Sequence, residues 1–223
     1  MFAACGFEVV VLTRIKKVAA DNVHWAVWDG ATPGDWTQEL EGATAVINLA
    51  GHTINCPHTP TNRKLIVDSR VNSVRAITAA IRRCHRPPTV LVQSSAVGFY
   101  GDTGATPRDE SSPSGVDFRA EACRAWEEAL DPTTLPVTRC VTLRAGVVLG
   151  RDGGALPTLA RLTRWFLGGA VGNGRQFISW IHQEDFNRIV CTAIENKHWS
   201  GTSTRQLRIP QPTPTSCANY ATH

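Results

Sequence analysis

The sequence predicts an α/β fold built around a parallel β-sheet. Two observations predict it. Segments rich in β-branched and apolar residues alternate with longer segments whose apolar residues recur at helical spacing. The strand-like segments are also apolar along most of their length, as expected for strands buried on both faces. Such strand–helix–strand alternation is typical of right-handed βαβ units in a parallel sheet.

The predicted strands are short and lie mostly in the first two thirds of the chain. They cover residues 8–13, 23–28, 43–50, 89–94 and 138–143.

Long helices are predicted between the later strands. One is expected over residues 62–85, where apolar side chains recur at helical spacing until Pro87 and Pro88 end it. Another is expected over residues 117–130, with Trp126 on its apolar stripe.

The texture of the sequence changes after Gly150. Glycine-rich turns separate two shorter predicted helices, residues 156–166 and 184–196, and a proline-rich extended segment follows. We therefore divide the chain into a first domain, residues 1–150, and a partial lobe, residues 151–223.

Composition excludes several classes of protein. The chain has 223 residues, of which 42% are hydrophobic and 19% charged, so it can bury a sizeable core. The 23 Lys+Arg residues exceed the 19 Asp+Glu residues by only four, and they are dispersed, which argues against nucleic-acid binding. No apolar stretch approaches the length of a membrane-spanning helix, which is about 20 residues. The expected partner is a small molecule, and the oligomeric state cannot be read from the sequence.

The seven cysteines are widely spaced and contain no Cys-x-x-Cys pair. A disulfide framework or a zinc module would have a different spacing. We therefore expect free thiols, no metal site and a reducing compartment, the cytoplasm.

Small and polar residues follow three of the predicted strands. They form the segments 48–51 (Asn-Leu-Ala-Gly), 94–102 (Ser-Ser-Ala-Val-Gly-Phe-Tyr-Gly-Asp) and 143–150 (Leu-Arg-Ala-Gly-Val-Val-Leu-Gly). The carboxyl ends of parallel strands are where open α/β sheets bind their ligands. These segments therefore mark the candidate site.

Together with residues 172–185, these segments resemble the NAD(P)-dependent epimerase/dehydratase family of extended short-chain dehydrogenases/reductases. More narrowly, the chain is similar to a nucleotide-sugar-epimerase-like branch, some of whose members carry a cell-division-inhibitor label. The match runs from about Gly6 to Asn219, and the order and spacing of the segments make it specific. The resemblance implies a Rossmann-like doubly wound sheet, NADP or NAD as cofactor, and a small sugar-like or carbonyl substrate.

The family's opening element has no counterpart in this sequence. Family members begin with a strand, a glycine-rich phosphate-binding turn and a helix. Here the first strand-like segment ends at Thr13 and Arg14 and resembles the family's second strand, so about twenty residues are expected to be missing before Met1. The sequence also stops where the family continues into its substrate lobe. We therefore expect a chain truncated at both ends, with a sheet that lacks its central first strand.

The resemblance assigns a cofactor role to residues at the strand ends. An arginine at position 14 can pair with the 2′-phosphate of NADP, although an exposed strand-end cation is an equal alternative. Small residues after the third predicted strand allow the dinucleotide close to the backbone, although close helix packing also requires them. The cofactor-binding residues expected from the resemblance are Arg14, Asp29, Asn48, Ala50, Gly51, Arg144, Gly146 and Val147.

The catalytic residues are incomplete. Ser95 lies where the family has its catalytic serine, but the chain contains no Tyr-x-x-x-Lys sequence. Alignment on Glu127 puts Arg119 at the tyrosine position and Cys123 at the lysine position. Tyr100 is therefore the substitute acid/base that we predict, because its loop should lie near the nicotinamide.

The last candidate residues line the expected substrate cleft. They are Arg175, Trp180 and His182, from the most recognisable stretch of the branch, while Asp185 is expected to cap the following helix. A structural, hydrogen-bonded histidine is an alternative for position 182, and an ion pair with a carboxylate such as Asp185 is an alternative for Arg144.

Two functions remain open from the sequence. The first is an NADP-dependent oxidoreductase or epimerase. The second is a non-catalytic nucleotide-binding remnant or regulatory module from a truncated gene, which the absent glycine turn and Tyr-Lys pair favour.

Overall fold

A computed structural model describes residues 2–3, 6–15, 17–18, 22–151, 153–169, 174 and 176–205. Within these residues, four parallel strands form the main sheet, in the order β3-β4-β5-β8. Their bounds are β3 Ala45–Asn48, β4 Val90–Ala96, β5 Arg139–Ala145 and β8 Gly201–Arg205. The α/β fold with a parallel, Rossmann-like sheet is thereby confirmed.

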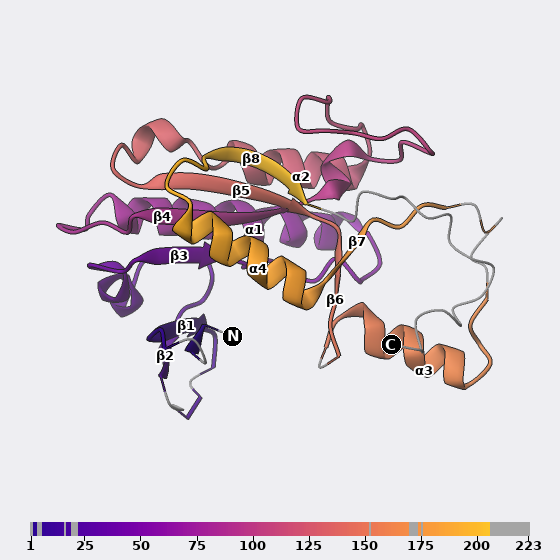
Figure 1. Cartoon of the computed structure of the whole chain (residues 1–223), viewed down its shortest axis with the longest axis horizontal. Helices are drawn as coiled ribbons and strands as arrows, with labels where there is room; N and C mark the ends of the chain where they lie inside the picture. The colour runs from indigo at the N-terminus through magenta and orange to yellow at the C-terminus, as the bar shows by residue number, and fades with distance from the viewer. Residues whose placement is uncertain are drawn as a thin grey trace.

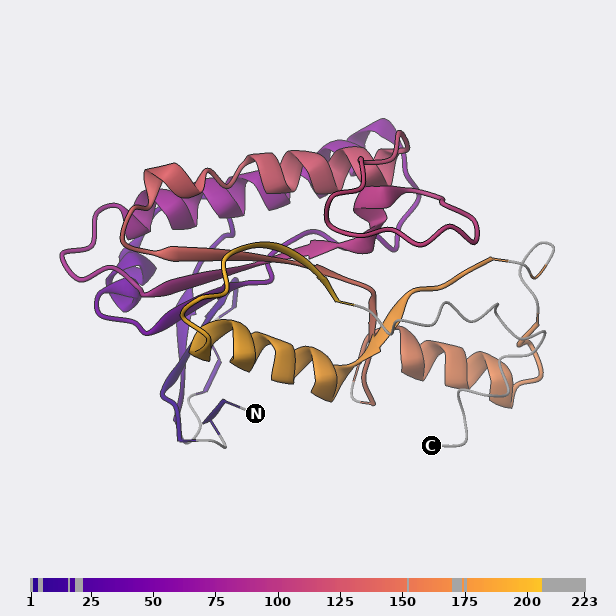
Figure 2. The same cartoon turned by 45° about the horizontal axis from the view of Figure 1, so that its top comes forward.

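Helices cover both faces of the main sheet. The helices α1 (Pro60–Ile81) and α2 (Phe118–Glu128) lie side by side on one face, and α4 (Gln183–Glu195) lies on the other (Figures 1 and 2). All three helices were predicted, within a few residues at their ends. Among the described helices, none is long and apolar enough to cross a membrane.

The starts of α1 and α2 follow from local chemistry. The Thr59 side chain accepts a hydrogen bond from the backbone N–H of Asn62, and Pro60 occupies the first turn, where a missing N–H costs little. Asp117 caps α2 in the same way, accepting from the N–H of Ala120. Both helices therefore begin just after the loops at the carboxyl edge of the main sheet.

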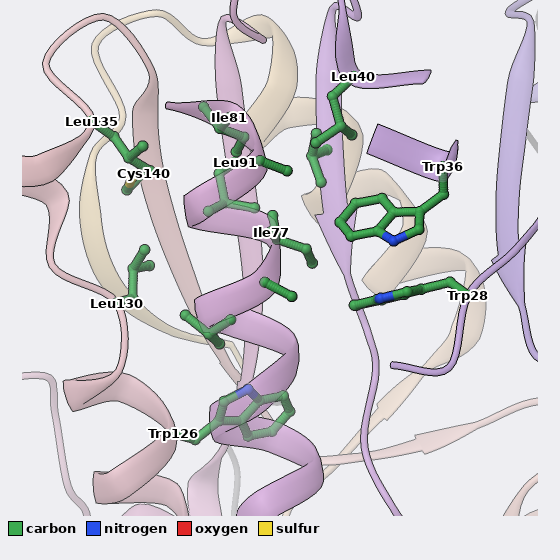
Figure 3. Close-up of a cluster of buried hydrophobic side chains, with 14 residues drawn as sticks. Trp28, Trp36, Leu40, Ile77, Ile81, Leu91, Trp126, Leu130, Leu135 and Cys140 are labelled. Carbon is green, nitrogen blue, oxygen red and sulfur yellow. The ribbon is translucent and has the colours of Figure 1, made fainter. Parts of the chain in front are cut away.

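The larger core lies between the main sheet and the α1–α2 layer. Figure 3 shows Ile77 and Ile81 of α1 against Leu91 of β4, with Trp126 of α2 along the same layer. The indoles of Trp28 and Trp36 extend this core beyond β3, with ring centroids 4.8 Å apart. The short 3-10 helix Asp35–Leu40 supplies Trp36 and Leu40 to it.

A second core lies under α4. Val90 and Val92 of β4 pack with Val141 of β5 and Val190 of α4. The guanidinium of Arg139 then donates to the carbonyl oxygens of Ala193 and Ile194 at 2.8 and 3.0 Å. A cation at the carbonyl end of a helix is electrostatically favourable, so Arg139 fixes α4 to β5.

The first two strands do not join the main sheet. β1 (Val9–Thr13) and β2 (Val23–Val27) pair with each other in parallel, and we call them the N-terminal pair. No described strand is hydrogen-bonded to both the pair and the main sheet. Figures 1 and 2 show the pair standing apart from β3 and turned relative to it.

The chain after β5 contains more strand than the sequence predicts. β6 (Val147–Leu149) and β7 (Trp180–His182) form a small parallel sheet, with α3 (Ala155–Arg164) between them in the chain. The chain then returns to the main sheet, because β8 pairs with β5. The division of the chain between residues 150 and 151 stays a prediction.

Candidate functional site

The predicted site residues of the main sheet lie at its carboxyl edge. β3, β4 and β5 are adjacent and parallel, and the register places Ser95 beside Arg144. The loops that follow these strands therefore meet at one edge, as the sequence predicts.

At the end of β3, the buried side chain of Asn48 forms hydrogen bonds that hold the strand end in place. Its side chain is 2% exposed and donates to Gln93 Oε1 at 2.9 Å and to Ser73 Oγ at 3.2 Å. The side-chain oxygen Oδ1 of Asn48 accepts from the backbone N–H of Ala50. The Asn48 side chain therefore stabilises the turn after β3 from the buried side. Ala50 in this turn is half-buried, and Gly51 is exposed.

The backbone at Gly51 lies against a half-buried arginine. A Cβ at Gly51 would be 3.1 Å from Cζ of Arg70. Arg70 donates to the carbonyl oxygens of His52 and Ile66, and its guanidinium lies 5.0 Å from the ring centroid of Trp126. Burial lowers the pKa of this guanidinium. Among the described residues, no carboxylate forms an ion pair with Arg70, so it is a cation whose partners are neutral.

Ser95, Glu127, Arg144 and Tyr100 form what we call the buried network. The hydroxyl of Ser95 donates to Glu127 Oε1 at 2.6 Å. Arg144 donates from Nε and Nη2 to the two oxygens of Glu127, at 2.8 and 2.7 Å. The side chains of this ion pair are only 6% and 14% exposed. Such a two-pronged contact holds both partners in one geometry.

Tyr100 completes the buried network. Its hydroxyl accepts from Arg144 Nη1 at 3.0 Å and lies 2.6 Å from Oγ1 of Thr204 in β8. In the contact with Thr204 either hydroxyl can be the donor. The guanidinium also lies 3.4 Å from the ring centroid of Phe99. Ser95 and Tyr100 are therefore brought together in one network, but both hydroxyls are already hydrogen-bonded within the protein.

The charge of Arg144 is strongly stabilised. Burial lowers the pKa of its guanidinium, but the hydrogen bonds to Glu127 and Tyr100 outweigh burial and raise the pKa above the usual value for arginine. The sequence left open that Arg144 forms an ion pair with a carboxylate, and this ion pair is present in the structure. The carboxylate is Glu127; Asp185 pairs with Arg188 instead.

Helix α2 supplies no basic group in place of the family's lysine. Cys123 is buried, and burial raises the pKa of its thiol to about 11, with the negative charge of Glu127 adding to the effect. A thiol with such a pKa is neutral at pH 7. Arg119, at the tyrosine position, is exposed.

Gly146 is required by packing. A Cβ at this position would lie 2.7 Å from the carbonyl oxygen of Ser179, in the segment that precedes β7. The N–H of Val147 donates to that same oxygen at 2.8 Å. Val147 itself is 43% exposed, so its side chain is available at the carboxyl edge.

Arg14 and Asp29 lie just after β1 and β2, the strands of the N-terminal pair, and share no hydrogen bond with the buried network. Asp29 forms a local turn, in which its carboxylate accepts from the N–H groups of Ala31 and Thr32 and from the Thr32 hydroxyl. These hydrogen bonds, led by that of the hydroxyl, lower its pKa to about 2. Arg14 is exposed. Their cofactor roles stay predictions.

The predicted substrate residues fall in a different place from the buried network. Trp180 is half-buried in β7, and His182 is exposed at the start of α4. His182 caps this helix, because its Nδ1 accepts from the N–H of Glu184 at 3.3 Å. The expectation that Asp185 would be the cap is therefore wrong, because the cap is His182 and Asp185 lies in the first turn of the helix. Arg175 lies outside the described residues.

Sequence reasoning missed the residues that hold the network together. Glu127 served only to align the helix, and Thr204 and Phe99 were not considered. The signal for Glu127 was available, since an arginine at the end of a buried strand requires a carboxylate. Nothing in the sequence marks Thr204, because the residues of β8, Gly201–Arg205, have no strand-like apolar pattern.

A shallow hollow lies between the first turns of α1 and α2. Its volume is about 310 Å³, and its lining includes Arg63, Lys64 and Phe118. It contains none of the predicted site residues, so it does not add to the candidate site.

Comparisons with known proteins place the chain among epimerase family proteins. A family model described as "NAD dependent epimerase/dehydratase family" matches residues 2–204. The "Epimerase family protein SDR39U1 homolog, chloroplastic" of Arabidopsis thaliana is 38% identical over 196 residues, which cover 86% of this chain and 56% of that protein. The "Epimerase family protein YfhF" of Bacillus subtilis is 32% identical over 219 residues, covering 96% of this chain and 70% of that protein.

The structural comparison gives a further epimerase family protein. The crystal structure of human epimerase family protein SDR39U1 (isoform 2) with NADPH superposes with a TM-score of 0.80 and 31% identity, covering 96% of this chain and 70% of that one. The chain therefore spans between about half and 70% of the length of these relatives.

Proposed function

The chain belongs to the NAD dependent epimerase/dehydratase family, and from that premise we propose that it carries the nucleotide-binding part of an NADP-dependent oxidoreductase or epimerase. Its substrate would be a small sugar-like or carbonyl compound. The observation that carries this proposal is the shared edge of the main sheet, where the carboxyl ends of β3, β4 and β5 meet. The NADPH in the human relative's structure supports the choice of cofactor.

The fit to a dinucleotide differs between the two halves of the proposed site. At the end of β3, the backbone of Gly51 is exposed, so a ligand can approach it closely. The guanidinium of Arg70 lies beside it and is hydrogen-bonded to neutral carbonyl groups, so its charge suits an anionic ligand. For the pyrophosphate, family members use a glycine-rich turn before a helix, which residues 1–223 do not contain. We propose that a complete cofactor site requires that turn.

NADP would supply a hydride acceptor or donor to this site. The chain's own contribution would be to position the substrate oxygen through Ser95 and to exchange a proton at Tyr100 Oη. Arg14 would pair with the 2′-phosphate and so distinguish NADP from NAD. Val147, exposed at the start of β6, would contact the nicotinamide side.

The buried network favours a second candidate, a nucleotide-binding module without catalysis. The hydroxyl of Ser95 is committed to Glu127, and Tyr100 is committed to Arg144 and Thr204. Cys123 supplies no ammonium beside them. In this candidate the network holds β4, β5, β8 and α2 together. Binding of the cofactor then serves regulation or stabilises the protein, without catalysis.

We also propose a reducing compartment such as the cytoplasm. Among the described cysteines, Cys56, Cys84, Cys123 and Cys140 are free thiols. Cys5 and Cys217 lie outside the described residues.

Titration with cofactor tests the proposed function. We expect saturable quenching of tryptophan fluorescence by NADPH, with weaker binding of NADH. Arg14→Gln should remove the difference between the two cofactors, while Arg82→Gln, exposed at the far end of α1, should not. A flat response to both cofactors would overturn the proposal.

Turnover separates the two candidates. NADPH oxidation with a panel of small aldehydes and ketones should fall at least tenfold in Tyr100→Phe if the protein is an enzyme. The melting temperature of the variant must be followed in parallel, because the change also removes the hydrogen bond to Thr204. Cofactor binding without turnover in the unmodified chain would establish the second candidate.

A further inference from the structure

Arg70 is a half-buried cation that has no anionic partner within the described residues. It lies on α1 and donates from Nη1 to the carbonyl oxygens of His52 and Ile66, both at 3.0 Å. Both acceptors are neutral, and none of the ion pairs of the described chain includes Arg70. Removing a charge from water is costly unless an opposite charge faces it. The described part of the chain therefore leaves Arg70 without a counterion.

The guanidinium lies beside the exposed turn that follows β3. A Cβ at Gly51 would be 3.1 Å from Cζ of Arg70 and 3.2 Å from Nη1. Because Gly51 is exposed and has no side chain, a ligand that reaches its backbone also comes close to the guanidinium. The hydrogen bond to His52 fixes the arginine to this same turn. Arg70 is therefore held at the carboxyl edge of the main sheet, where open α/β sheets bind their ligands.

Helix α2 contacts Arg70 from the other side. The guanidinium carbon lies 5.0 Å from the ring centroid of Trp126, a cation–π contact that orients the arginine. Trp126 is 6% exposed and lies along α1 (Figure 3), and its Nε1–H has no hydrogen-bond partner among the described residues. An unpaired cation and an unpaired donor are therefore in contact between the two helices.

The hydrogen bonds of Arg70 leave most of its donors available. Within the described chain, Arg70 uses only Nη1 to bind the two carbonyl groups. The N–H groups of Nε and Nη2 remain, and this edge of a guanidinium matches the two oxygens of a carboxylate or phosphate. Arg70 can therefore receive an anion without losing the contacts that hold it.

Arg144, the other arginine near Cys123, already has a counterion. Burial is the main cause of the raised pKa of the Cys123 thiol, and the positive charges of Arg70 and Arg144 both oppose this rise. Both guanidiniums therefore lie near the thiol. Arg144 pairs with Glu127 at 2.7 Å, whereas Arg70 pairs with neutral groups. Since Cys123 aligns with the family's lysine, α1 supplies an available cation where α2 supplies none.

We propose that Arg70 is the anion-binding residue of the candidate site, and that it pairs with a phosphate or carboxylate group of a ligand lying over Gly51. The proposal rests on the proposed function and narrows it, because the bound compounds must place an anionic group at this turn. The group can belong to the cofactor or to the substrate, since both classes share this chemistry.

NMR titration of the full chain tests the anion site. The probes are inorganic pyrophosphate and malonate, and the signal is the indole N–H of Trp126, assigned with Trp126→Phe. We expect a saturable shift, because the anion binds the guanidinium that contacts this indole. A pyrophosphate shift that NADPH displaces assigns the anionic group to the cofactor. A malonate shift that persists with NADPH assigns it to the substrate.

Three variants separate the charge of Arg70 from its packing. Arg70→Gln keeps a donor for the carbonyl groups but removes the charge, so the affinity for the anion should fall roughly tenfold or more. Arg70→Lys keeps the charge and should retain most of the affinity. Arg63→Gln is the matched control: Arg63 also lies on α1, contacts the ring of Phe118 at 4.9 Å and donates to the carbonyl of His58. It should leave the affinity unchanged.

Moving the charge back to α2 provides a further test. Cys123→Lys in the Arg70→Gln background places an ammonium group on the neighbouring helix and should restore anion binding. A purely structural role of Arg70 would not be rescued in this way. Melting temperatures show whether each variant is folded, and Arg70→Lys carries the test if the double variant is not.

The outcomes decide the proposal. No shift with either anion, or an equal shift in Arg70→Gln, overturns it, as does an Arg70→Gln variant that melts lower but binds the anion as before. Failure of the proposed function looks different. A flat NADPH titration, together with a pyrophosphate shift that Arg70→Gln removes, contradicts the NADP proposal and supports the anion site. NADPH binding that Arg70→Gln leaves unchanged, with no anion shift, does the reverse.

Discussion

The main sheet and the N-terminal pair are built from similar sequences but reach different levels of burial. The strand β4 begins Val-Leu-Val and its first three residues are at most 1% exposed. The strand β1 is Val-Val-Val-Leu-Thr, and each of its residues is half-buried. The difference lies in the neighbours, because β4 has a paired strand on both sides and helices over both faces, whereas β1 has one paired strand.

This contrast shows what apolar strand sequences encode. They specify a strand and the expectation of burial on both faces, but burial itself is provided by other parts of the fold. Most of the stability of the described chain should therefore reside in the main sheet and its buried network. The N-terminal pair should be the region that opens first.

The largest effect is expected from breaking the buried network of the main sheet. Glu127→Gln leaves the charge of Arg144 buried without a carboxylate, at a cost of about 3–5 kcal/mol in the free energy of unfolding. Chemical denaturation should detect this as a lower midpoint with an unchanged slope.

A matched control lies next to it on the same helix. Glu128→Gln removes an exposed carboxylate and should change the free energy of unfolding by less than about 0.5 kcal/mol. Equal effects of the two variants would mean that the ion pair of Glu127 with Arg144 does not stabilise the main sheet.

A paired substitution compares the two regions directly. Val92→Ala, in β4, should cost about 2–3 kcal/mol, because it removes two fully buried methyl groups and leaves a cavity. Val10→Ala, in β1, should cost less than about 1 kcal/mol, because that side chain is already half-exposed. Urea denaturation of both variants measures the difference, and similar costs would contradict the contrast drawn between the two regions.

A third effect concerns the junction between the main sheet and the β6–β7 sheet. Gly146→Ala places a methyl group against the backbone of Ser179, and we expect a loss of about 1–3 kcal/mol. The control is Gly153→Ala, where nothing lies within 4 Å of the added Cβ and the backbone is not left-handed. If the two variants unfold at the same denaturant concentration, Gly146 is not required by packing.

The sequence predicts the fold better than it predicts the site, and the reason is physical. Periodicity and apolar runs identify β1 to β5 and the helices α1, α2, α3 and α4, because these patterns are local. The partners of Arg144 are long-range: Glu127 is on α2, and Thr204 is on a strand that no pattern marks. The resemblance placed Ser95 and Tyr100 at one site, but it could not show that their hydroxyls are engaged within the protein.

The smallest expected effect is electrostatic and lies at the turn after the N-terminal pair. The pKa of Asp29 is lowered from its ordinary value of 3.8 to about 2 by hydrogen bonds that its ionised form accepts. A carboxyl group whose pKa is lower in the folded state stabilises the fold above its unfolded pKa, and this contribution disappears as pH falls from about 4 to about 2. Because Asp29 is exposed, the change in melting temperature should be small, and Asp29→Asn should reduce it further while Glu39→Gln, an exposed carboxylate nearby, should not. An NMR titration of the Asp29 carboxyl carbon gives the direct measurement. A midpoint near 3.8 would mean that the hydrogen bonds of the turn are open in solution. The difference in stability between the N-terminal pair and the main sheet would then be larger than the structure indicates.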